Sequence, residues 1–298
     1  MAEKDVEAGF GARAEKRGKV RRDRMAAVLA YALCSSTMLL INKVAVHSLP
    51  APSFVLICQL GSASAFVYGM AKGGWIESDK LETKKARAFL PAALSFLGVI
   101  YTNIKVLQYA NVETFIVFRC STPLLLSVCD FLFLNRELPS RYSWLCLLGI
   151  LFSAIGYVAS DSSFQLEALI WIFLWYIVFL FEMTYLKHLC DTVEMTNWGR
   201  VFYNNYMALF PLLCVGLVSR EDSVVAGVEW TAGRSIALIL SCLVGIGMSY
   251  TSFWLRNMVS ATAFTVIGIM CKIGTVILNY LYWDQHASTA GIGCLMIW

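Results

Sequence analysis

The sequence contains few charged residues. Asp, Glu, Lys and Arg make up 15% of the 298 residues, whereas 58% are hydrophobic and the mean hydropathy is +0.65. A soluble domain is about a quarter charged and close to half apolar. The shortage of charge excludes an ordinary soluble domain and favours a membrane protein.

Histidine and paired cysteine motifs are also scarce. The three histidines are scattered at His47, His188 and His286, and the ten cysteines form no Cys-x-x-Cys pair. An enzyme embedded in a membrane would need clustered His, Asp or Glu near an interface, so we expect no catalytic residue and no enzymatic activity. We interpret the cysteines as small apolar packing residues. We expect no disulfide framework, no metal site and no cofactor.

The first 24 residues contain no serine or threonine, and five of them are acidic. An organellar transit peptide is rich in serine and poor in acids, and the apolar run of a cleaved secretory signal is shorter than the one that follows here. We therefore expect residues 1–24 to form a disordered cytosolic tail with a basic end.

Long apolar runs fill the rest of the sequence, each close to the roughly 20 residues that cross a membrane as a helix. They predict nine helices, at 25–48, 51–71, 88–108, 112–134, 141–159, 165–188, 198–218, 233–254 and 259–282. A tenth begins near Ser288, and the eleven residues to Trp298 are expected to be a truncated span. The predicted fold class is an all-α polytopic membrane protein.

The basic residues indicate the orientation of these helices. Eighteen of the 24 Lys and Arg fall on the side of the N-terminal tail, and only Arg220 and Arg234 fall on the opposite side. Cytosolic loops carry the excess of Lys and Arg in membrane proteins. The sequence therefore predicts a cytosolic N-terminus.

The sequence resembles itself at an offset of 149 residues. Residues 112–140 align with 261–289, which places the fourth predicted helix over the ninth. Each repeat then has five helices, and because five is odd the halves insert with opposite orientation, a common plan of secondary transporters. We expect a first repeat at 25–159 and a second at 165–298.

Ionisable residues inside the apolar runs are costly and need an explanation. Lys272 lies near the middle of its predicted helix, with Gly268 and Cys271 on the same face. It either pairs with a buried carboxylate or receives an anion, and no carboxylate lies at matching depth, which favours an anion site. Lys43 can snorkel to the interface and Arg119 lies deeper, so both are secondary candidates for substrate contact.

Two further carboxylates, Asp130 and Glu182, lie near the cytosolic ends of their predicted helices. For both, a bond to a neighbouring helix is the favoured interpretation. A second polar stretch, Phe202, Tyr203, Asn204 and Asn205, lies near the cytosolic end of the seventh helix. Its amides suit the edge of a nucleobase and its aromatic rings suit stacking, and hydrogen bonding between helices is the alternative.

These motifs resemble those of nucleotide-sugar transporters in the drug/metabolite transporter superfamily, specifically the GDP-sugar (GDP-mannose/GDP-fucose) branch. FYNN stands intact at 202–205, and GIMCK at 268–272 is similar to the family's GxxNK, with Cys271 in place of asparagine. The resemblance covers nearly the whole chain after the tail. It implies ten helices in two inverted five-helix repeats.

The resemblance also implies roles for the matching residues. Tyr203, Asn204 and Asn205 would recognise guanine with Phe202 shaping the pocket, and Gly268 and Lys272 would line the sugar-diphosphate end. Because a thiol is a poor hydrogen-bonding group, Cys271 leaves the sugar open among mannose, fucose and galactose. The implied function is a multi-pass Golgi antiporter that exchanges a cytosolic GDP-sugar for luminal GMP.

Membrane lipids are expected around the protein, nucleic acid is not an expected partner, and a homodimer is left open. Three other functions are alternatives to this one. A plastid sugar-phosphate or phosphate exchanger of the same superfamily is opposed by the acidic tail and by Ile273, where that group has arginine. A transporter of another nucleotide-sugar and a non-transporting receptor or scaffold also remain open.

Overall fold

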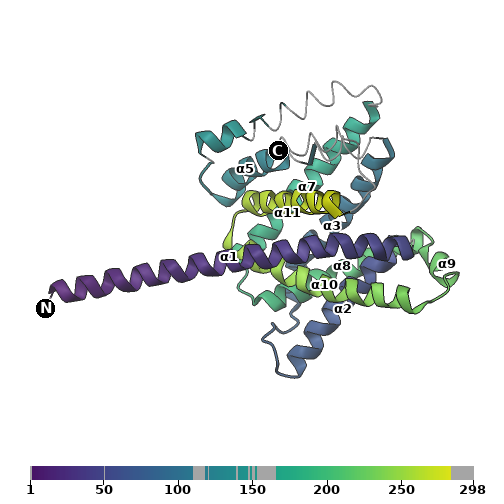
Figure 1. Ribbon diagram of the computed structural model, residues 1–298, viewed down its shortest axis with the longest axis horizontal. Helices are drawn as coiled ribbons and strands as arrows, with labels where there is room; N and C mark the ends of the chain where they lie inside the picture. Colours follow the sequence, from purple (N-terminus) through teal and green to yellow (C-terminus); the bar gives the residue numbers. More distant parts are fainter. Residues whose placement is uncertain are drawn as a thin grey trace.

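The computed structural model of the chain describes residues 2–49, 51–109, 118–119, 121–138, 140–146, 148–149, 152 and 166–282. Figure 1 shows a bundle of long helices. Every regular element in these ranges is a helix, which confirms the all-α fold class. The main elements are α1 (Ala2–Ser48), α2 (Pro52–Lys72), α3 (Thr83–Tyr109), α5 (Thr122–Leu134), α7 (Leu166–Thr192), α8 (Asn197–Val218), α9 (Glu221–Ala226), α10 (Ala232–Met258) and α11 (Ala261–Tyr282).

Six helices of the described part are long and apolar enough to cross a membrane. These spans are Arg17–Asn42, Pro52–Lys72, Thr83–Val106, Glu167–Thr192, Asn197–Val218 and Ala232–Met258. Thr122–Leu134 and Ala261–Cys271 are shorter apolar helices. The predicted fifth helix is helical at 141–146 and otherwise lies largely outside the described residues, as does the tenth from Ser288 onward.

The expectation of a disordered tail is wrong, because α1 is helical from Ala2. Its N-terminal part extends away from the bundle in Figure 1. Residues 2–24 are rich in Ala, Glu, Lys and Arg and contain no proline. These residues favour a helix, and a stable span directly behind them supplies the costly first turn.

The helices contact one another in matched pairs. α1 packs on α10 and α11, whereas α7 packs on α3 and α5; likewise α2 contacts α10, and α8 contacts α3. α2 also packs on α8, and α5 on α11. The helices correspond in four pairs: α1 with α7, α2 with α8, α3 with α10, and α5 with α11. When the two helices of every pair are exchanged, each of these contacts becomes another contact of the same set. An internal repeat produces such pairing, and the boundaries of the repeats stay predictions.

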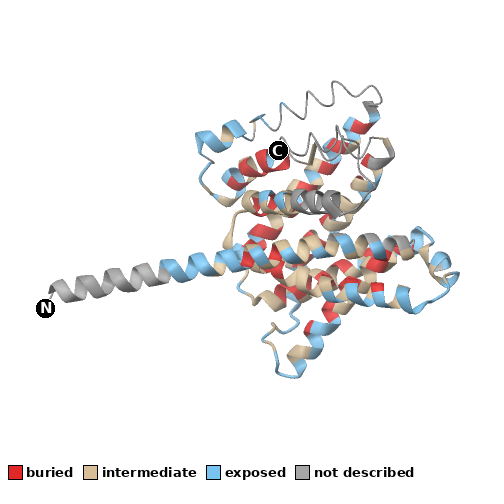
Figure 2. Cartoon of the chain, in the orientation of Figure 1, coloured by how far each residue is buried: buried red, intermediate tan, exposed pale blue. Residues whose placement is uncertain are grey.

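Large apolar side chains cover much of the outer surface. Leu33 is 71% exposed, Phe173 65% and Leu217 66%, all on different spans. Figure 2 shows that exposed and partly buried residues outnumber buried ones along the helices. Soluble proteins rarely expose apolar area on this scale, so the chain is a polytopic membrane protein whose outer surface suits lipid.

Carboxylates from distant segments bind the N-termini of several helices. Asp130 on α5 accepts hydrogen bonds from the Thr262 amide (3.0 Å) and hydroxyl (2.7 Å) in the first turn of α11. This confirms that Asp130 bonds a neighbouring helix. Glu221 on α9 accepts a bond of 3.1 Å from the Phe54 amide at the start of α2. Such bonds satisfy amides that a helix leaves without partners.

Candidate functional site

The FYNN motif lies in the second turn of α8, which Thr196 caps. The Thr196 side chain accepts a hydrogen bond of 3.0 Å from the Gly199 amide, as expected of a helix N-cap. Asp79, in the connector between α2 and α3, accepts bonds of 2.9 Å from the Thr196 amide and hydroxyl. A Cβ at Gly199 would clash with the Asp79 carboxylate, so this close approach needs glycine.

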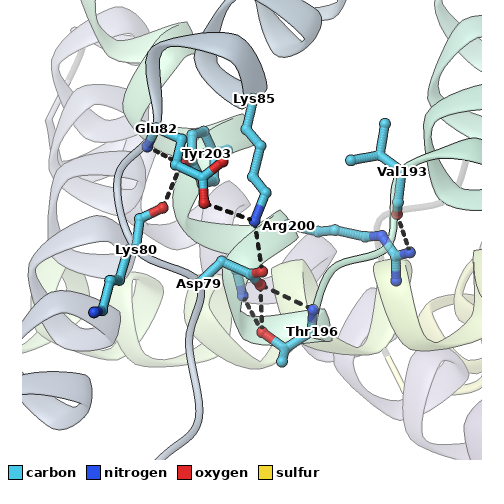
Figure 3. Close-up of polar contacts among 9 residues, drawn as sticks. Asp79, Lys80, Glu82, Lys85, Val193, Thr196, Arg200 and Tyr203 are labelled. Atoms are coloured by element: carbon cyan, nitrogen blue, oxygen red, sulfur yellow. Dashed lines mark hydrogen bonds and ion pairs between the residues drawn. The ribbon is translucent and has the colours of Figure 1, made fainter.

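Asp79 also pairs with Lys85 at the start of α3. The Lys85 Nζ lies 3.0 Å from Asp79 Oδ1 and 3.4 Å from Glu82 Oε1. Partial burial opposes ionisation of Asp79, but the hydrogen bonds from Lys85 and Thr196 outweigh it and hold the pKa of this carboxyl below its usual value. Figure 3 shows these groups converging on the start of α8.

Tyr203 is fully buried and its hydroxyl belongs to the same cluster (Figure 3). The hydroxyl donates to the Lys80 carbonyl (2.7 Å) and accepts from the Glu82 amide (2.6 Å). Its ring stacks on Phe89 at 5.7 Å between centroids. Because the hydroxyl has both a donor and an acceptor partner, Tyr203 holds the connector against α8 in this structure.

The other three motif residues differ in burial. Asn205 is 2% exposed and its Nδ2 donates to Ser249 Oγ on α10 at 3.3 Å. Asn204 is partly exposed, and its side chain makes no hydrogen bond to any described residue. The ring of Phe202 lies parallel to that of Tyr206 at 5.4 Å. Within the described residues, Asn204 therefore presents an amide without a hydrogen-bond partner, whereas Phe202 and Tyr206 form an aromatic surface on another face of α8.

The second motif lies on α11 beside α1. A Cβ at Gly268 would lie 3.2 Å from the Tyr31 hydroxyl oxygen, so glycine permits this close approach. The Tyr31 ring is 5.1 Å from that of Phe264, one turn before Gly268. Cys271 is partly buried and packs in the same cluster. Lys272 belongs to α11, and its side chain lies outside the described residues.

α10 links the two motifs. Ser249 contacts Asn205 of the first motif, and Leu255 packs with Tyr31 and Phe264 next to the second. Sequence reasoning missed both Ser249 and Tyr31. A serine or tyrosine inside an apolar run is common and uncharged, so only the contacts with the motif residues distinguish these two.

Two secondary candidates were expected from the sequence, Arg119 and Lys43. The Arg119 guanidinium is 5.6 Å from the centre of the Trp175 ring. The Lys43 side chain lies outside the described residues. Within the described ranges, no three His, Cys, Asp or Glu side chains gather as a metal site would require.

The chain is similar to curated GDP-sugar transporters over most of its length. It is 40% identical to GDP-fucose transporter 1 of Arabidopsis thaliana over 276 residues, covering 90% of this chain and 81% of that protein. It is 34% identical to the GDP-mannose transporter GONST3 of the same plant, covering 90% of this chain and 73% of the relative.

A more distant relative is GDP-mannose transporter 1 of Emericella nidulans, with 24% identity over 91% of this chain and 76% of that protein. No family model matches the chain.

Proposed function

The chain belongs to the GDP-sugar transporters, and from that premise we propose that it exchanges a cytosolic GDP-sugar for luminal GMP across the Golgi membrane. The observation that carries this proposal is the 40% identity to a GDP-fucose transporter across 90% of the chain. The excess of basic residues on the side of the N-terminus supports a cytosolic tail.

Asn204 is the residue we assign to the guanine edge, because its amide carries a donor and an acceptor and has no described protein partner. Phe202 stacks on Tyr206 on another face of α8 and would shape the pocket from there, and the Asn205 amide donates to Ser249. Tyr203 contributes by holding the start of α8, since its hydroxyl is already used. The lone amide thus marks the base end of the proposed site.

Gly268 and Lys272 form the proposed diphosphate and sugar end. The close approach of the Tyr31 hydroxyl to Gly268 leaves little room for a larger side chain there, and Lys272 supplies one positive charge. Cys271 lies at the edge of this region. Two of the relatives described above are named for fucose and for mannose, so both sugars are the first substrates to test.

Counterflow into vesicles tests the proposal. The purified chain is reconstituted into liposomes loaded with GMP, and uptake of labelled GDP-fucose and GDP-mannose is followed. We expect uptake that depends on internal GMP and that Lys272→Ala abolishes, because the phosphate charge then enters the membrane uncompensated. Lys272→Arg should also impair uptake, since a larger planar head needs room beside Gly268.

Empty vesicles and vesicles loaded with UMP serve as controls. Equal uptake with and without internal GMP would contradict the exchange mechanism. Exchange of inorganic phosphate or triose phosphate, without any response to guanine nucleotides, would favour the sugar-phosphate exchanger instead. Normal uptake by Lys272→Ala would remove the proposed role of that lysine.

A further inference from the structure

The proposed substrates carry more negative charge than one lysine offsets. A GDP-sugar has a negative charge on each of its two phosphates, and GMP carries about −1.5 to −2 near neutral pH. Moving uncompensated charge through hydrocarbon is costly. A site that holds either substrate at the level of Gly268 therefore calls for a second cation near Lys272.

Arg256, in the last turn of α10, is buried with unusually weak partners. Only 7% of it is exposed. Its Nη2 donates to the Met183 sulfur at 3.4 Å, a soft acceptor, and its guanidinium lies 3.9 Å from the centre of the Phe264 ring. Its Nη1 is buried with no hydrogen-bond partner in the described part of the chain.

The buried arginine on α8 has different surroundings. Arg200 is 6% exposed, but its Nη2 donates at 3.0 Å to two carbonyls, those of Cys190 and Val193, at the end of α7. Those bonds satisfy carbonyls that a helix end leaves without partners. Although Arg200 Nε is also buried without a hydrogen-bond partner among the described residues, its two bonds to carbonyls give it a structural role. The Arg256 guanidinium contacts only a sulfur and a ring, which offset less of its desolvation.

Arg256 lies close to the proposed diphosphate end. Phe264, beneath its guanidinium, is four residues before Gly268 on the same face of α11, a rise of about 6 Å. Tyr31 bridges the two positions, because its ring packs on Phe264 and its hydroxyl approaches Gly268. The phenylalanine that the guanidinium contacts is therefore about one helical turn from the glycine.

Glu182 is the carboxylate that would be expected to form an ion pair with Arg256. It lies on α7 next to Met183 and is 6% exposed. Among the described residues, however, no ion pair joins Glu182 to Arg256. The guanidinium keeps hydrogen-bonding capacity that a phosphate, with several acceptor oxygens, would satisfy.

We propose that Arg256 is the second cation of the nucleotide site, donating from Nη1 to a phosphate of the bound GDP-sugar or GMP. This inference rests on the proposed function. Arg256 and Lys272 together balance the two phosphate charges, and Phe264 holds the guanidinium in place. Glu182 competes weakly with the ligand for Arg256, which eases release of the phosphate.

Binding of guanosine, GMP and GDP-fucose to the full chain in lipid nanodiscs tests this role. The affinity for GMP or GDP-fucose is divided by the affinity for guanosine, and this ratio is the gain that the phosphates add. We expect Arg256→Gln to lower that gain by roughly 10- to 100-fold, the size of a lost charged hydrogen bond, while the affinity for guanosine changes less than about twofold. Arg256→Lys should retain part of the gain.

Arg200→Gln is the matched control, an equally buried arginine that is expected to lose stability and keep the phosphate gain. Arg256→Gln with wild-type affinity for guanosine and an unchanged gain would overturn the proposal. If that variant does not fold, Glu182→Gln decides: tighter GMP binding supports the role, and unchanged binding rejects it. A wild-type chain that gains affinity from phosphate, with the whole gain kept in Arg256→Gln, rejects this inference alone, whereas a wild-type chain that gains nothing from phosphate or binds none of the three compounds rejects the proposed function as well.

Discussion

Tyr203 and Asn204 are neighbours in the sequence but lie in different surroundings. The Tyr203 hydroxyl is buried between the Lys80 carbonyl and the Glu82 amide, whereas the Asn204 amide is partly exposed. A polar group that already has partners inside the protein has little capacity left for a ligand. At the scale of single residues, the motif therefore divides into a structural part and a recognition part.

Replacing each residue separately tests this division. Tyr203→Phe removes two buried hydrogen bonds and should lower the free energy of unfolding by about 1–3 kcal/mol, without changing the preference for guanine. Asn204→Ala should leave the stability of the free protein nearly unchanged and abolish the extra stabilisation by GMP over AMP, UMP and CMP. Thermal unfolding with each nucleotide at equal concentration measures both effects.

Two outcomes would contradict this assignment. Loss of guanine preference in a stable Tyr203→Phe protein would place that hydroxyl in the ligand site. Unchanged preference in Asn204→Ala would move base recognition away from this amide.

At the scale of elements, two carboxylates fasten α2 and α8 to each other. Asp79 follows α2 and bonds the start of α8, and Glu221 follows α8 and bonds the start of α2. The two bonds correspond under the exchange of helices that relates the helix contacts. Each of the two spans is thereby held by a carboxylate that follows the other.

Asp79 should make stability depend on pH in the acid range. Because its pKa in the folded protein lies below the ordinary value of 3.8, the stabilisation is fully present above that value and is lost as pH falls through the lower folded pKa. Asp79→Asn should cost about 1 kcal/mol at pH 7, discounted for solvent screening. The difference from the wild-type protein should shrink below pH 3.8.

Thermal unfolding of both proteins between neutral and acid pH measures this dependence. Lys85→Met offers a control, since it removes the cation but leaves the bonds from Thr196 to Asp79 in place. A constant difference between wild-type protein and Asp79→Asn at every pH would show that the charge of Asp79 does not stabilise the fold.

At the scale of the whole molecule, the charge distribution predicts the orientation. The basic residues of 1–24 should lie on the cytosolic side, and the segment around Arg220 and Arg234 on the luminal side. In sealed vesicles with the cytosolic face of the membrane outward, protease should remove an N-terminal epitope and spare one inserted at 227–231. Cleavage of the second epitope alone would show that the chain has the opposite orientation.

Much of the fold was predictable because hydrocarbon thickness sets the length of a span. The predicted run at 51–71 became Pro52–Lys72, and 198–218 became Asn197–Val218, within a residue. The length of α1 was not predictable from hydropathy, since its first residues are polar and are helical because their helix propensity extends the span behind them. Apolar runs therefore locate the span within α1 but not the polar part of the helix that precedes it.

The sequence by itself determined the membrane class, the main spans and the positions of both motifs, because these depend on local composition and spacing. The packing of the helices decides that Tyr203 bonds Lys80 and Glu82, that Asp130 caps α11, and that Arg256 is buried beside Phe264 with no hydrogen bond from Nη1 to any described residue. Those pairings join segments far apart in the chain, and which of them form depends on how the helices pack.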